Sequence, residues 1–286
     1  MKPPTHLIKF AGVALMLLAP DCRLAAAQNP AVAQQFPAAR AVNVCPDTPL
    51  RLTFDSPPVL GPGGKIRIFD AATKTAVETI DVSSPTATKT IGGLPDFKYY
   101  PVIITGNEAA IYPKNGSLGY NKGYYVTIDP GVFSVDGATY AGMDEAAWRF
   151  TTKRSAPAAG TKDLTVDAEG AGDFCTVQGA LDFIPDGNTT RTTILVREGT
   201  YPEIIFFTNK HSITLMGEDR RQTVITYANN ANLNASGGNP FAGGAPDPSA
   251  AAAKAGGSIY RRGLLMAHRV NDLTIANLTL RNTTPQ

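Results

Sequence analysis

The chain has 286 residues, of which 43% are hydrophobic and 17% are charged, a balance that is typical of folded domains and excludes an extended disordered chain. The 27 glycines and 22 prolines favour a turn-rich β architecture over a helical bundle, and the length allows about two domains. The formal net charge is only +2 and no basic cluster stands out, so we expect no nucleic-acid partner.

The first residues have the layout of an export signal. Residues 1–27 combine a basic start, an apolar run at 10–19 and small residues at 25–27, which predicts a signal peptide that is removed on secretion to the periplasm or the medium. The apolar run is half of the ~20 residues that a membrane span needs, so we expect no membrane anchor after cleavage. A lipoprotein signal at Cys22 is the alternative, but Asp21 precedes it where a small residue is required.

The next part of the chain is patterned for short strands. Residues 28–41 are rich in Ala, Pro and Gln and are expected to form a leader with little structure, whereas 42–153 alternate apolar and polar residues between turn clusters. This pattern predicts an antiparallel β-sandwich. The clearest predicted strands are Leu50–Phe54, Lys65–Phe69, Tyr124–Ile128 and Trp148–Thr152.

The pattern changes after a predicted linker at 154–161. Residues 173–184 carry apolar side chains at three- and four-residue spacing, which predicts a helix with Asp173 as its N-cap and Pro185 after its end. Short apolar runs then recur without two-residue hairpins, as in a β-solenoid. The predicted strands are 193–196, 204–207, 213–216, 223–226, 263–267, 273–276 and 278–280.

A long segment at 228–257 is rich in Gly, Ala, Asn and Pro. A loop of this length either has a function, such as walling a cleft, or is a surface excursion. Both interpretations remain open from the sequence.

Two ordered sets of motifs resemble known families. Asp47–Leu50, Tyr124–Ile128 and the ending Trp148–Thr152 resemble a bacterial Ig-like domain. The turn and helix of 167–181 and the box of 198–203 resemble the opening of the pectin methylesterase (pectinesterase) family. Further matches to this family lie at 215–219, 223–225 and 273–283.

The resemblance implies an all-β fold, in which an Ig-like sandwich at 42–153 precedes the first rungs of a right-handed parallel β-helix at 162–286. The helix at 173–184 would cap the amino-terminal end of the coil. A cap is physically required there, because an open end exposes strand edges and core side chains.

The resemblance also implies an enzyme that hydrolyses methyl esters of polygalacturonate, with methylesterified pectin as its partner and with no metal or cofactor. In this aspartyl esterase family one aspartate is the nucleophile and a second is the acid and base, while glutamines stabilise the oxyanion and an arginine orients the nucleophile. None of the motifs that carry these residues occurs in the chain. We therefore expect the catalytic residues beyond Gln286 and an inactive, monomeric fragment.

The family box contributes Gly199, Tyr201 and Glu203. The box borders the cleft in the family, but a turn glycine and a packing tyrosine favour a structural role here. The alternative to an enzyme is a non-catalytic carbohydrate-binding or adhesive secreted module. A pectate lyase is disfavoured, because such lyases use calcium and the chain shows no carboxylate cluster to bind it.

Two cysteines would survive removal of the signal, Cys45 in the first predicted domain and Cys175 in the second. An oxidising compartment would permit a disulfide between them that joins the domains. Two separate buried thiols are the other interpretation, since sequence does not fix pairing geometry. The scattered cysteines and histidines predict no metal site.

Overall fold

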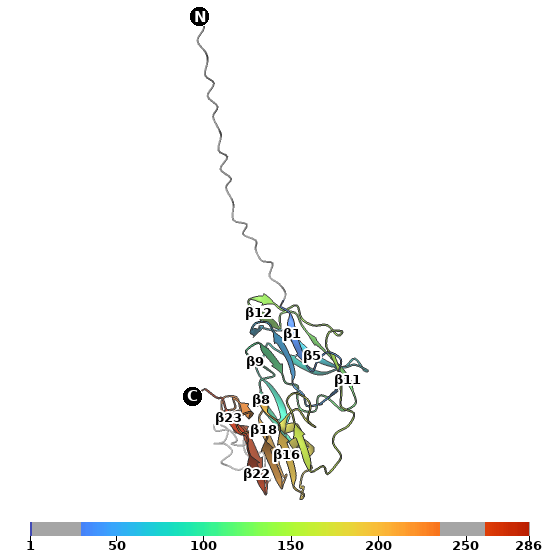
Figure 1. Ribbon diagram of the computed structural model, residues 1–286, viewed down its shortest axis with the longest axis vertical. Helices are drawn as coiled ribbons and strands as arrows, with labels where there is room; N and C mark the ends of the chain where they lie inside the picture. Colours follow the sequence, from blue (N-terminus) through green and yellow to red (C-terminus); the bar gives the residue numbers. More distant parts are fainter. Residues whose placement is uncertain (2–29, 235–260, 286) are drawn as a thin grey trace, which may run out of the picture.

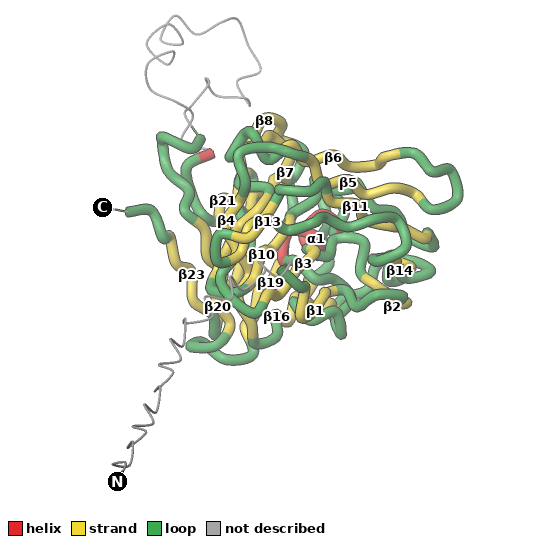
Figure 2. Tube along the Cα trace, turned by 90° about the horizontal axis from the view of Figure 1, so that it is seen from above, coloured by secondary structure: helices red, strands yellow, loops and turns green. Residues whose placement is uncertain are grey.

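The computed structural model describes residues 1, 30–234 and 261–285. Apart from Met1, the predicted signal peptide lies outside these residues, as does most of the predicted loop at 228–257. The described chain is nearly all β, with strands of the first half above those of the second half in Figure 1. The one α-helix of the described residues lies among yellow strands in Figure 2.

The first domain is built from antiparallel sheets. One sheet has the order β1-β3-β10-β9, a second β2-β14-β11-β5-β6 and a third β13-β12-β4, and only the β2–β14 pair is parallel. The strands are β1 (Val32–Phe36), β2 (Ala41–Val44), β3 (Leu50–Phe54), β4 (Pro58–Leu60), β5 (Lys65–Asp70), β6 (Ala76–Asp81), β9 (Val102–Thr105), β10 (Glu108–Ile111), β11 (Gly123–Ile128), β12 (Phe133–Val135), β13 (Ala138–Thr139) and β14 (Arg149–Thr152).

Alternation along these strands places one face in the core. In β3 every second residue is buried, so Leu50, Leu52 and Phe54 point inward. Trp148 is fully buried in the same core, and its indole Nε1 donates a hydrogen bond of 2.8 Å to the carbonyl of Pro37. Buried tryptophan needs such a partner for its N–H.

The amino-terminal segment differs from the expectation of an unstructured leader at 28–41. Val32–Phe36 forms β1, which pairs antiparallel with β3. The composition of this segment does not predict a strand, because β1 lies at the edge of its sheet. An edge strand pairs with one neighbour only and needs little burial.

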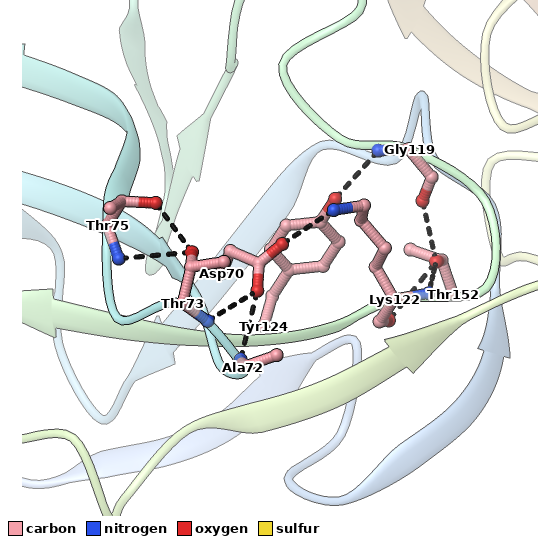
Figure 3. A network of polar contacts seen from close by, with 8 residues as sticks. All are labelled: Asp70, Ala72, Thr73, Thr75, Gly119, Lys122, Tyr124 and Thr152. Atoms are coloured by element: carbon pink, nitrogen blue, oxygen red, sulfur yellow. Dashed lines mark hydrogen bonds and ion pairs between the residues drawn. The ribbon is translucent and has the colours of Figure 1, made fainter.

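A polar network fixes two loops of this domain (Figure 3). Asp70 accepts hydrogen bonds from the backbone N–H groups of Ala72 and Thr73, and Lys122 Nζ lies 2.8 Å from its other oxygen. The bond from Lys122 and those from the two N–H groups lower the pKa of Asp70 to about 2. On the far side of Lys122, the Thr152 hydroxyl donates to the carbonyl of Gly119.

The second domain stacks its strands in three parallel sheets. The orders are β15-β16-β19-β22, β17-β20-β23 and β18-β21. Successive turns of the chain therefore add successive strands to the same sheets. The strands are β15 (Asp163–Val166), β16 (Thr192–Val196), β17 (Gly199–Pro202), β18 (Ile205–Thr208), β19 (Ile213–Gly217), β20 (Thr223–Tyr227), β21 (Leu265–His268), β22 (Leu273–Ala276) and β23 (Thr279–Asn282).

Helix α1 (Val177–Phe183) packs against β15 and β18 at the start of this stack of parallel strands. The stack, β15 to β23, is called the coil below. The predicted N-cap, Asp173, is wrong: Thr176 is the N-cap, and its hydroxyl accepts from the N–H of Gly179. Asp173 instead accepts from the N–H of Thr165 in β15. The helix ends at the C-cap Ile184, directly before Pro185, as the sequence predicts.

A hairpin of the first domain reaches the second. Strands β7 (Ala87–Ile91) and β8 (Leu94–Tyr99) form this hairpin, and β8 lies beside β18 in Figure 1. Phe97 packs against Phe206 with ring centroids 5.8 Å apart, and both side chains are fully buried. The shared core contains Ile91, Leu94, Phe97 and Tyr99 from the hairpin and Ile204, Phe206, Tyr227, Leu233 and Leu264 from the coil.

Candidate functional site at the domain junction

A cavity of about 590 Å³ lies between the two domains. Both domains line it, and the predicted box residues Gly199, Tyr201 and Glu203 are part of its wall. Helix α1 forms another part of the wall through Gln178 and Asp182. Ligand sites often form at domain interfaces, so this cavity is the candidate functional site in the described part of the chain.

The amino-terminal end of α1 is closed by side chains from three segments. A helix begins with N–H groups that lack partners within the helix, and this one has no acidic residue in its first turn. Thr176 binds the N–H of Gly179 at 3.0 Å. Glu203, from the turn after β17, accepts from the N–H groups of Val177 and Gln178 at 2.8 and 2.9 Å.

The third capping side chain comes from the other domain. Asp47 accepts from the N–H groups of Cys175 and Thr176, at 3.0 and 2.8 Å, and from the Thr176 hydroxyl at 2.7 Å. Gly179 makes this approach possible, because a Cβ at that position would lie 2.3 Å from Asp47 Oδ2. Burial raises the pKa of Asp47, and the three donated hydrogen bonds oppose that effect.

Glu203 is buried, and within the described part of the chain it makes no ion pair. Desolvation raises its pKa to about 7, against the lowering effect of the two helix N–H groups and of the Lys89 charge. Because both carboxylate oxygens are engaged by the backbone of α1, Glu203 is not positioned to attack a ligand.

The other two box residues also make internal contacts. Gly199 has a φ of +153°, and a Cβ there would meet the ring of Tyr201 at 3.4 Å. Tyr201 is buried, and its hydroxyl donates to the carbonyl of Arg197 at 3.0 Å. All three predicted box residues therefore make contacts inside the second domain.

Lys89 is one of the cationic residues of the cavity wall, with Arg51 and Lys114. Its ammonium donates to Asn115 Oδ1 at 3.3 Å and lies 4.8 Å from the centre of the Tyr99 ring. Burial lowers the pKa of Lys89, and the Glu203 and Asp182 carboxylates oppose this effect. The wall can thus offer a donor and several acceptors to a polar ligand.

The two cysteines named from the sequence meet at the edge of the same junction. Both thiols are free and buried, and their sulfurs lie within 4.8 Å of each other and of an Asp47 oxygen. Lys153 lies close by, donating to the carbonyls of Gly172 and Asp173. This group has the donor types of a metal site, but the Asp47 oxygens already accept three hydrogen bonds and the Lys153 ammonium disfavours a cation.

Sequence reasoning missed Asp47 and Gly179, which form the contact that locks the helix to the first domain. It also missed Gln178, whose side chain binds the backbone of Phe206 in β18. One signal was available, since a short helix with no acidic residue in its first turn must find its capping acceptors elsewhere in the chain. The partner of such a helix end is set by tertiary packing, so local pattern did not reveal that it is Asp47.

Two known families match different parts of the chain. A family described as bacterial Ig-like domain matches residues 26–152, and a family described as pectinesterase matches residues 163–242. The resemblance to an Ig-like domain followed by a pectinesterase is confirmed. These two matches fall on the antiparallel domain and on the start of the parallel coil.

Relatives of known name match part of the chain. Pectinesterase 31 of Arabidopsis thaliana is 39% identical over 72 residues, which cover 25% of this chain and 23% of that protein. Pectinesterase 1 of Citrus sinensis is 38% identical over 71 residues, 24% of this chain and 12% of the relative. Probable pectinesterase 67 of Arabidopsis thaliana is 31% identical over 114 residues, 38% of this chain and 31% of the relative.

The chain therefore spans less than a third of the length of these relatives. Among solved structures, CopC from Methylosinus trichosporium OB3b aligns at 14% identity with a TM-score of 0.26, over 44% of this chain and 94% of that one. This similarity is too low to support a fold or a function. No helix in the described part of the chain is long and apolar enough to cross a membrane.

Proposed function

We propose that this protein is the amino-terminal part of an exported pectinesterase, which hydrolyses the methyl esters of polygalacturonate and so modifies cell-wall pectin. The observation that carries the proposal is the similarity to pectinesterases over residues 163–242. The stacked parallel strands, the capping helix and the buried box of this segment form one packed unit, which is consistent with the expected fold.

The coil is proposed to be the start of a right-handed parallel β-helix. Its strands stack in register, so that Leu164, Ile194 and Leu215 follow one another through successive rungs of one sheet. Burial falls at the last described rung, where Ile275 and Leu280 are 39% and 43% exposed. Further rungs would cover these apolar side chains, as stacking requires in a solenoid.

The catalytic aspartates are proposed to lie in a segment that follows Gln286. The family chemistry needs one carboxylate free to attack the ester carbonyl and a second to transfer protons. In the described coil Glu203 is occupied as a helix cap, while Asp173 binds the backbone of β15 and Asp272 pairs with Arg191. These engagements support a structural role for the present segment.

The test is methanol release from highly methylated pectin by the chain as given and by the chain extended with the downstream reading frame. We expect release only from the extended protein. Methanol release by the chain alone would refute the placement of the catalytic residues. If neither protein releases methanol and both migrate more slowly in gels that contain pectin, a non-catalytic binding module is the better explanation.

A further inference from the structure

We propose that Cys45 and Cys175 form a disulfide that fastens the Ig-like domain to the capping helix of the coil. The inference does not depend on esterase activity. It rests on the position of two thiols that come from different domains, more than a hundred residues apart in sequence, and lie side by side in a buried site.

The first support is geometric. Cys45 is 0% and Cys175 is 2% exposed, and their sulfurs lie within 4.8 Å of each other. Cys45 also points its sulfur to the carbonyl of Gly172, at 3.7 Å, in the turn that precedes Cys175. Domain docking alone therefore brings the sulfurs together, so a covalent bond would require little backbone movement.

The second support is that the neighbouring residues hold both cysteines in place. Asp47 is two positions from Cys45, and it binds the N–H of Cys175 itself. The Lys153 ammonium binds the carbonyls of Gly172 and Asp173. These cross-domain contacts fix the backbone on both sides of the sulfur pair, which limits the entropy lost when the bond forms.

The third support is the electrostatic asymmetry of the pair. The hydrogen bond from Cys175, together with the Lys153 charge, lowers the pKa of Cys45. The same hydrogen bond, followed by burial, raises the pKa of Cys175. Lys153 belongs to the same domain as Cys45, where its N–H donates to the carbonyl of Val44, so its charge acts on Cys45 before docking. Since the thiolate is the reactive form, Cys45 is the sulfur that attacks first.

The step needs an external disulfide, such as oxidised glutathione or the active-site disulfide of a thiol oxidoreductase. The Cys45 thiolate attacks one sulfur of that disulfide and releases a thiol, which leaves a mixed disulfide on Cys45. The Cys175 thiol then loses its proton and attacks the Cys45 sulfur, releasing the second thiol. The pair is oxidised by two electrons and loses two protons, and the external disulfide is reduced to two thiols.

Burial determines when this reaction occurs. Neither sulfur is open to a bulky oxidant in the docked structure, so we infer that the mixed disulfide forms before the domains close and that docking delivers Cys175 to it. The finished bond is then shielded from reductants, and it resists them until the domains separate.

The test uses the full chain with Cys22→Ser, which removes the only other cysteine. The protein is refolded with reduced and oxidised glutathione or with excess dithiothreitol, then denatured and alkylated with N-ethylmaleimide. After glutathione refolding we expect no alkylated thiol and one cross-linked peptide pair that contains Cys45 and Cys175. After dithiothreitol refolding we expect two alkylated thiols.

A second readout follows the domains themselves. A protease site placed in the exposed linker stretch at 158–160 allows the chain to be cut between the domains. After glutathione refolding, the two fragments should migrate as one band on a denaturing gel without reductant. They should migrate as two bands when reductant is added. Cys45→Ala/Cys175→Ala is the matched control, and its fragments should separate under both conditions while its Tm stays the same with and without dithiothreitol.

Three results would overturn the proposal. Two alkylated thiols after glutathione refolding would show that the sulfurs stay reduced, and glutathione on each cysteine would show that they fail to meet. Retention of both thiols together with one equivalent of bound zinc, lost in the double variant, would identify a metal site in place of the disulfide. A gain of several degrees in Tm on oxidation, absent from the double variant, would support the disulfide.

Discussion

The two domains meet through two contacts of different character. On one side, the β7–β8 hairpin buries Phe97 against Phe206 of the coil, in a cluster composed mainly of aliphatic and aromatic side chains. On the other side, Asp47 reaches the amino-terminal end of α1, where it accepts hydrogen bonds from two backbone N–H groups and from the Thr176 hydroxyl. Apolar burial is non-directional, whereas hydrogen bonds to fixed N–H groups require one orientation.

The difference shows how stability and orientation are divided in this molecule. The apolar contact removes large surfaces from water and should supply most of the free energy that holds the domains together. The polar contact gains little net free energy per bond, but it is costly to leave unmade. It therefore selects the docked arrangement, and the cysteine pair lies at that side. Substitutions around the junction test this division.

The largest effect is expected from Phe97→Ala. Removing a fully buried aromatic side chain costs about 3–5 kcal/mol, because transfer free energy is lost and a cavity remains. Denaturant unfolding should show this loss and should separate the transitions of the two domains. Phe69→Ala is the control, since Phe69 stacks on Tyr125 at a partly exposed face of the first domain. Equal losses in both variants would contradict the importance of the apolar contact.

The next effect is the pH dependence contributed by Glu203. Its folded pKa of about 7 lies above its unfolded value of 4.5, so its contribution to stability is fully present below pH 4.5 and is lost as the pH rises through about 7. The loss should reach roughly 3 kcal/mol, because one unit of pKa corresponds to about 1.4 kcal/mol.

Glu203→Gln measures this contribution. The variant should be less stable than the wild type near pH 5, because glutamine can accept only one of the two helix N–H bonds. The difference should shrink or reverse by pH 8, and unfolding at a series of pH values will show it. A constant difference between pH 4.5 and 8 would mean that Glu203 is charged throughout this range.

A smaller effect is expected at Gly179. Glycine to alanine in a helix normally stabilises by up to about 1 kcal/mol. Here the new Cβ would lie 2.3 Å from Asp47 Oδ2 and displace that carboxylate. We expect Gly179→Ala to destabilise the protein by about 1–3 kcal/mol, the cost of leaving buried donors unpaired.

The double-mutant cycle with Asp47→Ala isolates the cause. If the clash with Asp47 is responsible, the Gly179→Ala penalty should fall in the Asp47→Ala background, and the measured coupling should exceed the additive error of about 0.5 kcal/mol. Additive losses would place the cause within the helix instead.

Much of the fold was predictable because its strands carry their own pattern. The alternation of Leu50–Phe54 gave β3 at the same bounds, and Leu273–Ala276 gave β22. Asp173 was named as the N-cap because it begins the apolar pattern, yet it satisfies a strand N–H and leaves capping to Thr176. Local sequence offers several capping residues, and tertiary contacts select among them.

The candidate site was predicted less well. The box at Gly199, Tyr201 and Glu203 was found by resemblance, but its contact with α1 depends on how the coil closes. Lys89 and Asp47 give no local signal, because each acts on a residue of the other domain. The hydrophobic pattern fixes which residue faces the interior, but it does not specify which surface of a second domain will cover it.

The smallest effect is expected from Arg51, at the rim of the polar contact. Its guanidinium donates two hydrogen bonds to Glu169 of the second domain, at 2.9 and 2.7 Å, and lies 4.0 Å from the centre of the Phe36 ring. The Glu169 side chain is 71% exposed, so solvent screens the pair. We expect Glu169→Gln to cost about 0.2–1 kcal/mol, and less at high salt.

Arg51→Ala should cost more than Glu169→Gln, because it also removes the packing of the guanidinium on Phe36. Arg51→Lys is the informative intermediate, since lysine keeps the charge but loses the paired geometry. If Arg51→Lys retains wild-type stability at low salt, charge alone holds this rim. A loss equal to that of Arg51→Ala would show that the two parallel hydrogen bonds and the ring contact carry the interaction, so that orientation dominates even where the junction meets solvent.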